Sequence, residues 1–142
     1  MALACTLMAS CGKCDAPILF PEKDFQTTVD GKEVSIYTLK GGDITMQVTN
    51  FGARVVSLWT PDKDGKYDDI VLGYNNIDNY INNPGERFLG AVVGPYANRI
   101  ANGTYTIGEE VYNFPQNNNG QTLHGGLKGL DMVVWDVKEV SE

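Results

Sequence analysis

Residues 34–49 read VSIYTLKGGDITMQVT, and this stretch decides the fold class. In its second half, residues 44–49, apolar and polar residues alternate strictly as in a β-strand, so Ile44, Met46 and Val48 share one face. The first half is also typical of a strand, and the segment KGGD between the halves consists of residues that favour turns. The stretch therefore predicts a β-hairpin.

Short strand-like segments recur along the rest of the chain. Residues 104–107 and 111–114 flank a turn that begins with Gly108, which predicts a second hairpin. Single strands are predicted at 54–60 (RVVSLWT), 69–74 (DIVLGY) and 132–137 (MVVWDV), and the one helical candidate is the short segment 77–81. The pattern predicts a mostly β, antiparallel domain.

The composition narrows the possible partners. With 142 residues, 42% of them hydrophobic and 20% charged, the chain is long enough for one globular domain with a buried core. The net charge of -7 comes from acidic residues spread along the sequence, so there is no basic stripe to follow a phosphate backbone. We expect no nucleic-acid partner.

The N-terminal segment MALACTLMASCGKC holds all three cysteines, which therefore cannot staple the domain through disulfides. Residues 2–10 are small and apolar, as in a secretory signal, and Met8 to Cys11 resembles a bacterial lipobox. This predicts lipidation of Cys11 and an exported, periplasmic or membrane-anchored lipoprotein; otherwise the protein would be cytoplasmic. A redox pair or half a zinc site at Cys11 and Cys14 is the competing interpretation, but the sequence offers neither a second cysteine pair nor a βαβ unit.

The sequence divides into three regions. Residues 1–14 are the signal-like segment, 15–32 form a linker and the start of the domain, and 33–142 form the domain itself. The sequence stops at residue 142 directly after an apolar strand candidate. We therefore expect residues 33–142 to be the N-terminal part of a larger domain.

Four motifs follow one another along the chain: NFGAR (50–54), VGPYANRIANG (93–103), LHGG (123–126) and KGLDMVVW (128–135). In this order they resemble the motifs of the aldose 1-epimerases, also called galactose mutarotases. The resemblance extends from about Val34 to about Val137. It departs from the family at Pro95, where an arginine is usual.

The resemblance implies both a fold and an activity. The fold is the N-terminal part of a large antiparallel β-sandwich, and the activity is interconversion of the α and β anomers of a free hexose such as galactose or glucose. That reaction removes the proton of the C1 hydroxyl and protonates the ring oxygen, so it needs an acid and a base but no cofactor. By resemblance, Asn98 and Arg99 bind sugar hydroxyls, and His124 binds the sugar and takes part in catalysis near the ring oxygen.

An alternative stays open because the resemblance is partial. Family members carry a second histidine and a glutamate base, whereas this chain has a single histidine and no glutamate in a matching motif. We therefore expect the chain by itself to be inactive. The alternative function is a non-catalytic carbohydrate-binding domain of the same fold.

Outside the family context, the same residues have simpler interpretations. A histidine before two glycines is most often a turn residue, and an isolated arginine is most often solvated. Trp59 and Trp135 are able to stack on a sugar, but strand tryptophans usually belong to the core, so neither is assigned to the site.

Overall fold

The computed structural model describes residues 15–82 and 85–139, and its main feature is a four-stranded antiparallel sheet. The strands are β3 (Ile36–Gly41), β4 (Ile44–Thr49), β5 (Arg54–Pro61) and β6 (Tyr67–Asp69), in that spatial order. The register pairs Leu39 with Met46 and Met46 with Leu58. The predicted hairpin over residues 34–49 and the strand at 54–60 are both confirmed.

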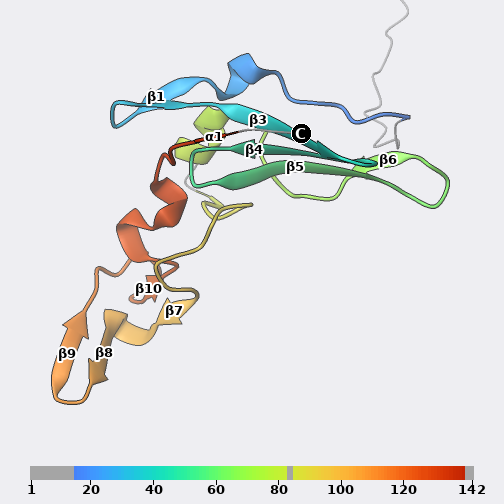
Figure 1. Cartoon of the computed structure of the whole chain (residues 1–142). Helices are drawn as coiled ribbons and strands as arrows, with labels where there is room; N and C mark the ends of the chain where they lie inside the picture. The colour runs from blue at the N-terminus through green and yellow to red at the C-terminus, as the bar shows by residue number, and fades with distance from the viewer. Residues whose placement is uncertain (1–14, 83–84, 140–142) are drawn as a thin grey trace, which may run out of the picture.

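Short elements surround this sheet. Before it come a 3-10 turn, η1 (Glu22–Phe25), and the hairpin of β1 (Thr27–Val29) and β2 (Lys32–Val34); after it comes the helix α1 (Ile77–Ile81) at the predicted place. The remaining elements are β7 (Arg99–Ile100), η2 (Ala101–Gly103), β8 (Thr104–Ile107), β9 (Glu110–Asn113), β10 (Thr122–Leu123), η3 (Gly126–Lys128) and η4 (Leu130–Met132). They form a region that projects away from the sheet, with the β8–β9 hairpin at its far end (Figure 1). This second hairpin was also predicted.

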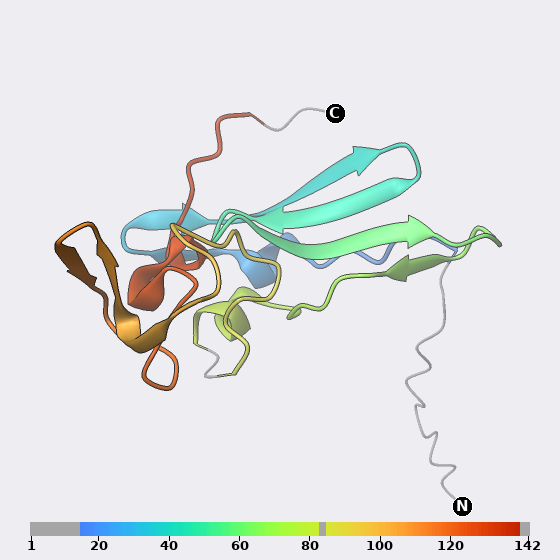
Figure 2. The same ribbon diagram turned by 90° about the horizontal axis from the view of Figure 1, so that it is seen from below.

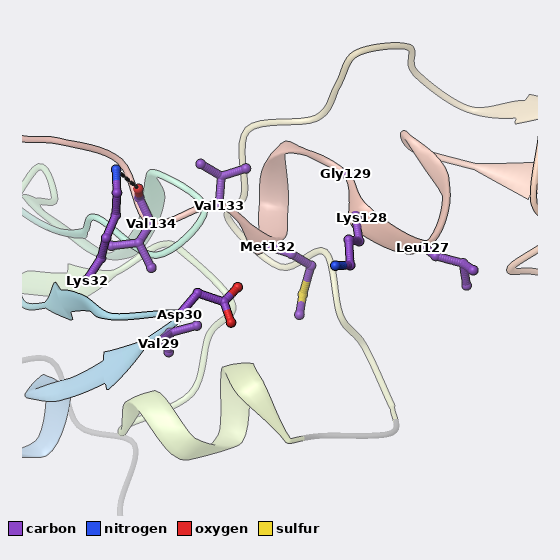
Figure 3. A pocket seen from close by; sticks show the side chains of 9 residues that line it. All are labelled: Val29, Asp30, Lys32, Leu127, Lys128, Gly129, Met132, Val133 and Val134. Atoms are coloured by element: carbon purple, nitrogen blue, oxygen red, sulfur yellow. Dashed lines mark hydrogen bonds between the residues drawn. The ribbon is translucent and has the colours of Figure 1, made fainter.

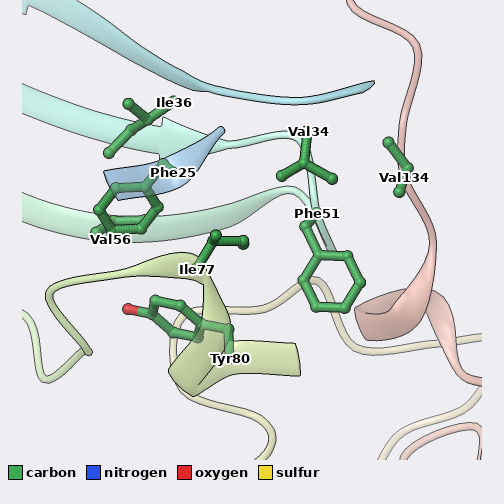
Figure 4. Close-up of a cluster of buried hydrophobic side chains, with 8 residues drawn as sticks. All are labelled: Phe25, Val34, Ile36, Phe51, Val56, Ile77, Tyr80 and Val134. Carbon is green, nitrogen blue, oxygen red and sulfur yellow. The ribbon is translucent and has the colours of Figure 1, made fainter. Parts of the chain in front are cut away.

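The hydrophobic core lies where the sheet, η1 and α1 meet. Phe25, Val56 and Tyr80 come from these three elements and are each at most 3% exposed. The side chains converge in Figure 4, and the complete set is Phe25, Val34, Ile36, Phe51, Val56, Ile77, Tyr80 and Val134. Phe25 lies in the region that the sequence analysis describes as a linker and start of domain, so packing of the domain begins before residue 33.

Strand β4 buries its polar face more deeply than its apolar one. Gln47 and Thr49 of β4 are at most 2% exposed, whereas Ile44, on the apolar face of the same strand, is 48% exposed. Gln47 accepts a hydrogen bond from the Phe20 N–H at 2.9 Å and donates one to the Phe20 carbonyl at 3.1 Å. The segment that carries η1 passes behind the sheet in the view of Figure 2.

Two predicted strands are wrong. Residues 69–74 leave the sheet at Asp69, because its Oδ1 accepts hydrogen bonds from the backbone N–H of both Leu58 and Val71 and turns the chain outward. Residues 132–137 form only an isolated bridge between Val134 and Phe51. Only Asp69 of the predicted 69–74 strand belongs to the sheet, as the last residue of β6.

The predicted signal segment, including Cys11, lies outside the described residues. Within the described residues, no helix has the length and apolar character needed to cross a membrane.

Candidate functional site

The short pairing of β7 with β10 brings three predicted site residues together. Arg99 is the register partner of Leu123, which places Asn98 opposite His124 just beyond the ends of the two strands. The His124 N–H donates to the Asn98 carbonyl at 3.1 Å. Asn98, Arg99 and His124 are therefore neighbours, although at least 25 positions separate the ANR motif from the histidine.

The imidazole of His124 is held in a defined orientation. The backbone N–H of Asn98 donates to His124 Nδ1 at 3.0 Å. Since Nδ1 acts as the acceptor, the proton of the neutral imidazole is on Nε2. Nε2 is thus the nitrogen that remains to donate a hydrogen bond to a ligand.

The turn that presents His124 depends on unusual backbone conformations. His124 has a φ of 50°, and Gly125 and Gly126 follow with φ of 91° and 80°. A Cβ atom on Gly125 would collide with the carbonyl of Gly94. The two glycines permit positive φ and close approach, and at Gly125 the close neighbour is backbone.

The side chain of Asn117 holds this turn from the other side. Its Nδ2 donates to the carbonyls of Leu123 and Gly126 at 3.0 and 3.2 Å, and its Oδ1 accepts from the Leu123 N–H at 2.7 Å. None of the four motifs includes Asn117. In the structure it fixes the segment that carries the histidine.

A cavity of about 280 Å³ opens beside His124 and is close to the lower end of the size range of small-molecule sites. Its lining consists of Gly85, Glu86, Arg87, Phe88, Arg99, Asn118, Leu123 and His124. Arg99 Nε donates to Asn118 Oδ1 at 3.2 Å, which orients the guanidinium along the cavity wall. The cavity thus offers donors, a carboxylate and an aromatic ring, which suit a small polar ligand with an apolar face.

Several residues of this cavity cannot be predicted from the sequence. Glu86, Arg87 and Phe88 precede the ANR motif and belong to none of the four motifs. The ring of Phe88 meets the imidazole of His124 edge-on, with 4.8 Å between the ring centroids. No periodicity or spacing in the sequence marks these residues.

A larger cavity, of about 510 Å³, lies elsewhere and is lined mainly by apolar side chains (Figure 3). It opens between the β1–β2 hairpin, which contributes Val29 and Asp30, and the η3–η4 segment, which contributes Met132. None of Asn98, Arg99 and His124 lines it. The chemistry therefore points to the smaller cavity despite its size.

The NFGAR and KGLDMVVW motifs meet behind the site at a buried arginine. The Arg54 guanidinium donates to the carbonyls of Arg87 at 2.7 Å, Leu89 at 3.0 Å and Asp131 at 3.0 Å. It lies between the rings of Phe51 and Tyr80. Burial lowers the pKa of Arg54, and the carboxylate of Asp131 acts in the opposite direction. Arg54 therefore connects residues 87–89, which begin at the cavity wall, to Asp131 in the segment that follows His124.

In the described part of the chain, no three histidine, cysteine, aspartate or glutamate side chains cluster in a way that would hold a metal ion. Trp59 and Trp135 do not line the 280 Å³ cavity. Pro95, the departure from the family motif, does not line it either.

A mostly antiparallel β framework with a histidine, two arginines and an asparagine around one small cavity defines a class of small-ligand proteins. The comparisons with known proteins specify the family. The family described as aldose 1-epimerase matches residues 35–142. The chain belongs to the aldose 1-epimerase family, as the four motifs indicated.

Individual relatives agree with this assignment. The chain is 40% identical over 112 residues to a protein of Arthroderma benhamiae named "Probable aldose 1-epimerase", and 36% identical over 105 residues to the galactose mutarotase of Mus musculus. These matches cover 76% and 74% of this chain but only 26% and 30% of the relatives. The chain therefore spans less than a third of the length of these two relatives.

Solved structures show the same fold. A GalM/aldose epimerase homologue from C. elegans matches with a TM-score of 0.69 and 33% identity, over 76% of this chain and 33% of that one. Galactose 1-epimerase from Lactobacillus acidophilus matches with a TM-score of 0.66 and 29% identity, over 82% of this chain and 33% of that one. The predicted fold class, the N-terminal part of a galactose mutarotase-like β-sandwich, is confirmed.

Proposed function

We propose that this chain supplies the sugar-binding part of an aldose 1-epimerase, which interconverts the α and β anomers of a free hexose such as galactose or glucose. The family match and the relatives named as galactose mutarotases support the proposal. The reaction transfers only protons, so it requires an acid and a base and no redox or group-transfer cofactor. We place the protein in hexose metabolism.

The observation that carries the proposal is the orientation of His124. Because Nδ1 accepts the Asn98 N–H, Nε2 is the nitrogen that can donate a hydrogen bond to an oxygen of a bound sugar. Arg99 and Asn118 add donors on the same cavity, and Glu86 adds an acceptor. A neutral sugar is held by fixed donors and acceptors of this kind rather than by long-range charge.

We assign the roles of the residues as the family resemblance implies them. His124 binds the sugar and polarises the oxygen that must gain a proton during ring opening. Arg99, which lines the cavity, binds hydroxyls together with Asn98, which does not line the cavity but whose backbone orients the imidazole.

The second candidate function is a non-catalytic carbohydrate-binding domain. It is favoured by one observation, namely that the chain has a single histidine. One imidazole cannot efficiently remove a proton at C1 and deliver another to the ring oxygen at the same time. Binding without catalysis is therefore the expected behaviour of the chain alone.

A chimera distinguishes these possibilities. Residues 35–142 replace the matching segment of the mouse galactose mutarotase, and polarimetry follows the optical rotation of fresh α-galactose. We expect an active chimera that loses activity with His124→Ala and keeps it with the exposed-site control Lys40→Ala, while the isolated chain leaves the rate unchanged. A folded chimera that binds galactose but is inactive would favour the binding domain, and one that neither binds nor turns over galactose would reject both functions.

We also propose that Cys11 carries a lipid that tethers the protein to a membrane, on the basis of the lipobox-like segment Met8 to Cys11. Expression in a bacterium with labelled palmitate tests this. We expect label in the membrane fraction for the wild type and none for Cys11→Ser, with Cys5→Ser as the control. A wild-type protein that is unlabelled and recovered in the soluble fraction would reject the tether.

A further inference from the structure

An ion pair adjoins the sugar site and connects it to the buried Arg54. Asp131 is 1% exposed, and its carboxylate accepts two hydrogen bonds from Arg87, from Nε at 2.6 Å and from Nη2 at 2.9 Å. This bidentate geometry fixes the plane of the Arg87 guanidinium, whereas a single hydrogen bond would let the plane rotate. The two residues lie 44 positions apart in the sequence.

The fixed guanidinium in turn contacts an aromatic ring of the cavity. The Cζ atom of Arg87 lies 5.0 Å from the centre of the Phe88 ring, within the range of a cation–π interaction. The ring of Phe88 also packs edge-on against the imidazole of His124, with 4.8 Å between the ring centroids. A continuous series of contacts therefore leads from Asp131 through Arg87 and Phe88 to the imidazole.

The far end of this series is immobilised by burial. Arg54 and Asp131 are at most 1% exposed, and Arg54 also binds the main-chain carbonyls of both Arg87 and Asp131. The side chain of Arg87 is 24% exposed and lies between this buried pair and the cavity, which it also lines. Removing one partner of a buried, hydrogen-bonded ion pair releases the other from its fixed geometry.

We propose that Asp131 and Arg87 are positioning residues for the sugar site, because they hold Phe88 against His124 and so add a second contact that fixes the imidazole, besides its Asn98 hydrogen bond. Neither residue has to contact the sugar through the reacting atoms. The role in sugar binding rests on the proposed sugar site. The series of contacts from Asp131 through Arg87 and Phe88 to His124, here called the relay, can be measured without any ligand.

The single histidine makes the relay accessible to NMR, because its ring-proton signals have no histidine neighbours to overlap them. In the wild type we expect nuclear Overhauser contacts between the rings of Phe88 and His124. Arg87→Lys keeps the positive charge but loses the bidentate hydrogen bonding, and Asp131→Asn keeps the side-chain shape but loses the negative charge. In both variants we expect these contacts to weaken and the His124 ring signals to shift.

Controls separate positioning from general stability. Lys40→Arg is an equally conservative exchange at an exposed site of β3 and should change neither the contacts nor the shifts. Phe88→Leu should abolish the ring contact outright. Melting temperatures and amide spectra show whether each variant is folded. If Asp131→Asn does not fold, Arg87→Lys alone is used for the test, since Arg87 is partly exposed and its exchange should disturb the core less.

The outcomes are distinguishable from those of the proposed function. Unchanged His124 signals and ring contacts in Arg87→Lys, or a wild type without the ring contact, would overturn the positioning proposal. Galactose is then added to each protein, and we expect weaker binding by the two variants than by Lys40→Arg. If no hexose shifts the His124 ring signals of the wild type, the sugar site is rejected, whatever the ring contacts show.

Discussion

At the residue scale, the site depends on backbone conformations that few residues adopt easily. Asn98 and His124 both have positive φ, and they exchange two hydrogen bonds across the β7–β10 pair. Asparagine tolerates this region better than most residues, and two glycines extend the turn after the histidine. Local strain of this kind occurs where the surrounding structure fixes the conformation, as Asn117 does here.

Gly125 tests this account of the turn. Gly125→Ala combines a positive φ with a collision against the Gly94 carbonyl, so we expect a loss of roughly 3 kcal/mol or more in the free energy of unfolding. Gly108→Ala is the matched control, because Gly108 also has positive φ but has open space around its Cβ position. It should cost only about 1 kcal/mol in urea unfolding. Equal losses in both variants would show that the Gly94 contact is unimportant.

The sequence reveals some of these residues and not others. Asn98, Arg99 and His124 are found through local motifs, and their pairing confirms that the motifs meet. Phe88 and Arg87 are not found, since their importance arises from contacts with His124 and Asp131, which are distant in the sequence. A single sequence contains no signal for such contacts.

At the element scale, β4 shows how an alternating pattern identifies a strand without identifying the buried face. The alternation predicted the strand correctly and placed Ile44, Met46 and Val48 together. The most buried residues of the strand are nevertheless polar, because the amide of Gln47 meets the hydrogen-bonding backbone of Phe20. The strand predictions for residues 69–74 and 132–137 are wrong for a related reason, since an apolar run resembles a strand whether or not a partner strand is present.

Gln47 should therefore contribute more to stability than an exposed glutamine. Gln47→Met leaves the Phe20 N–H and carbonyl without partners, and we expect a loss of about 1 to 3 kcal/mol in unfolding free energy. Gln26→Met, at an exposed site beside η1, is the control and should change stability by less than about 0.5 kcal/mol. A Gln47→Met variant as stable as the wild type would mean that the buried polar face contributes no net stability.

Tyr80 of α1 predicts how stability depends on alkaline pH. Burial raises the pKa of Tyr80 above the ordinary value of 10.0, although its hydroxyl accepts the Tyr74 N–H at 2.7 Å, which acts in the opposite direction. The unfolded chain therefore loses this proton first, so stability is full below pH 10 and falls as the pH rises toward the folded-state pKa.

Tyr80→Phe removes both effects at once. We expect a loss of about 1 kcal/mol at neutral pH, from the lost hydrogen bond, but a shallower decline above pH 10. Tyr37→Phe is the control at neutral pH, because the Tyr37 hydroxyl has no hydrogen bond within the described residues and its loss should leave the stability there unchanged. Denaturant unfolding between neutral pH and pH 11 measures both, and parallel curves for the wild type and Tyr80→Phe would contradict the assignment.

At the scale of the whole molecule, the sheet presents an apolar row on its less buried face. Leu39, Met46 and Leu58 are register partners across three strands and are all half-buried. Exposed apolar surface of this kind favours association between molecules. We expect the chain to self-associate with rising concentration in static light scattering.

A charge placed in the middle of this row should reduce the association. Met46→Glu is the test variant, and Ile70→Glu is the control because Ile70 is 63% exposed and lies outside the strands. The control should associate like the wild type. Monodisperse wild-type protein over the whole concentration range would contradict the role of this face.

The most direct test of the central claim, a sugar site built around His124, is an NMR titration of the 142-residue chain with galactose, followed at the ring signals of its only histidine. We expect a saturable shift of these signals in the wild type. Arg99→Ala should weaken binding by about 1.5 kcal/mol, the lower end for a charged hydrogen bond because Arg99 is exposed, while Lys40→Ala should bind as the wild type does. His124 signals that do not respond to galactose or glucose in a folded protein would contradict the account.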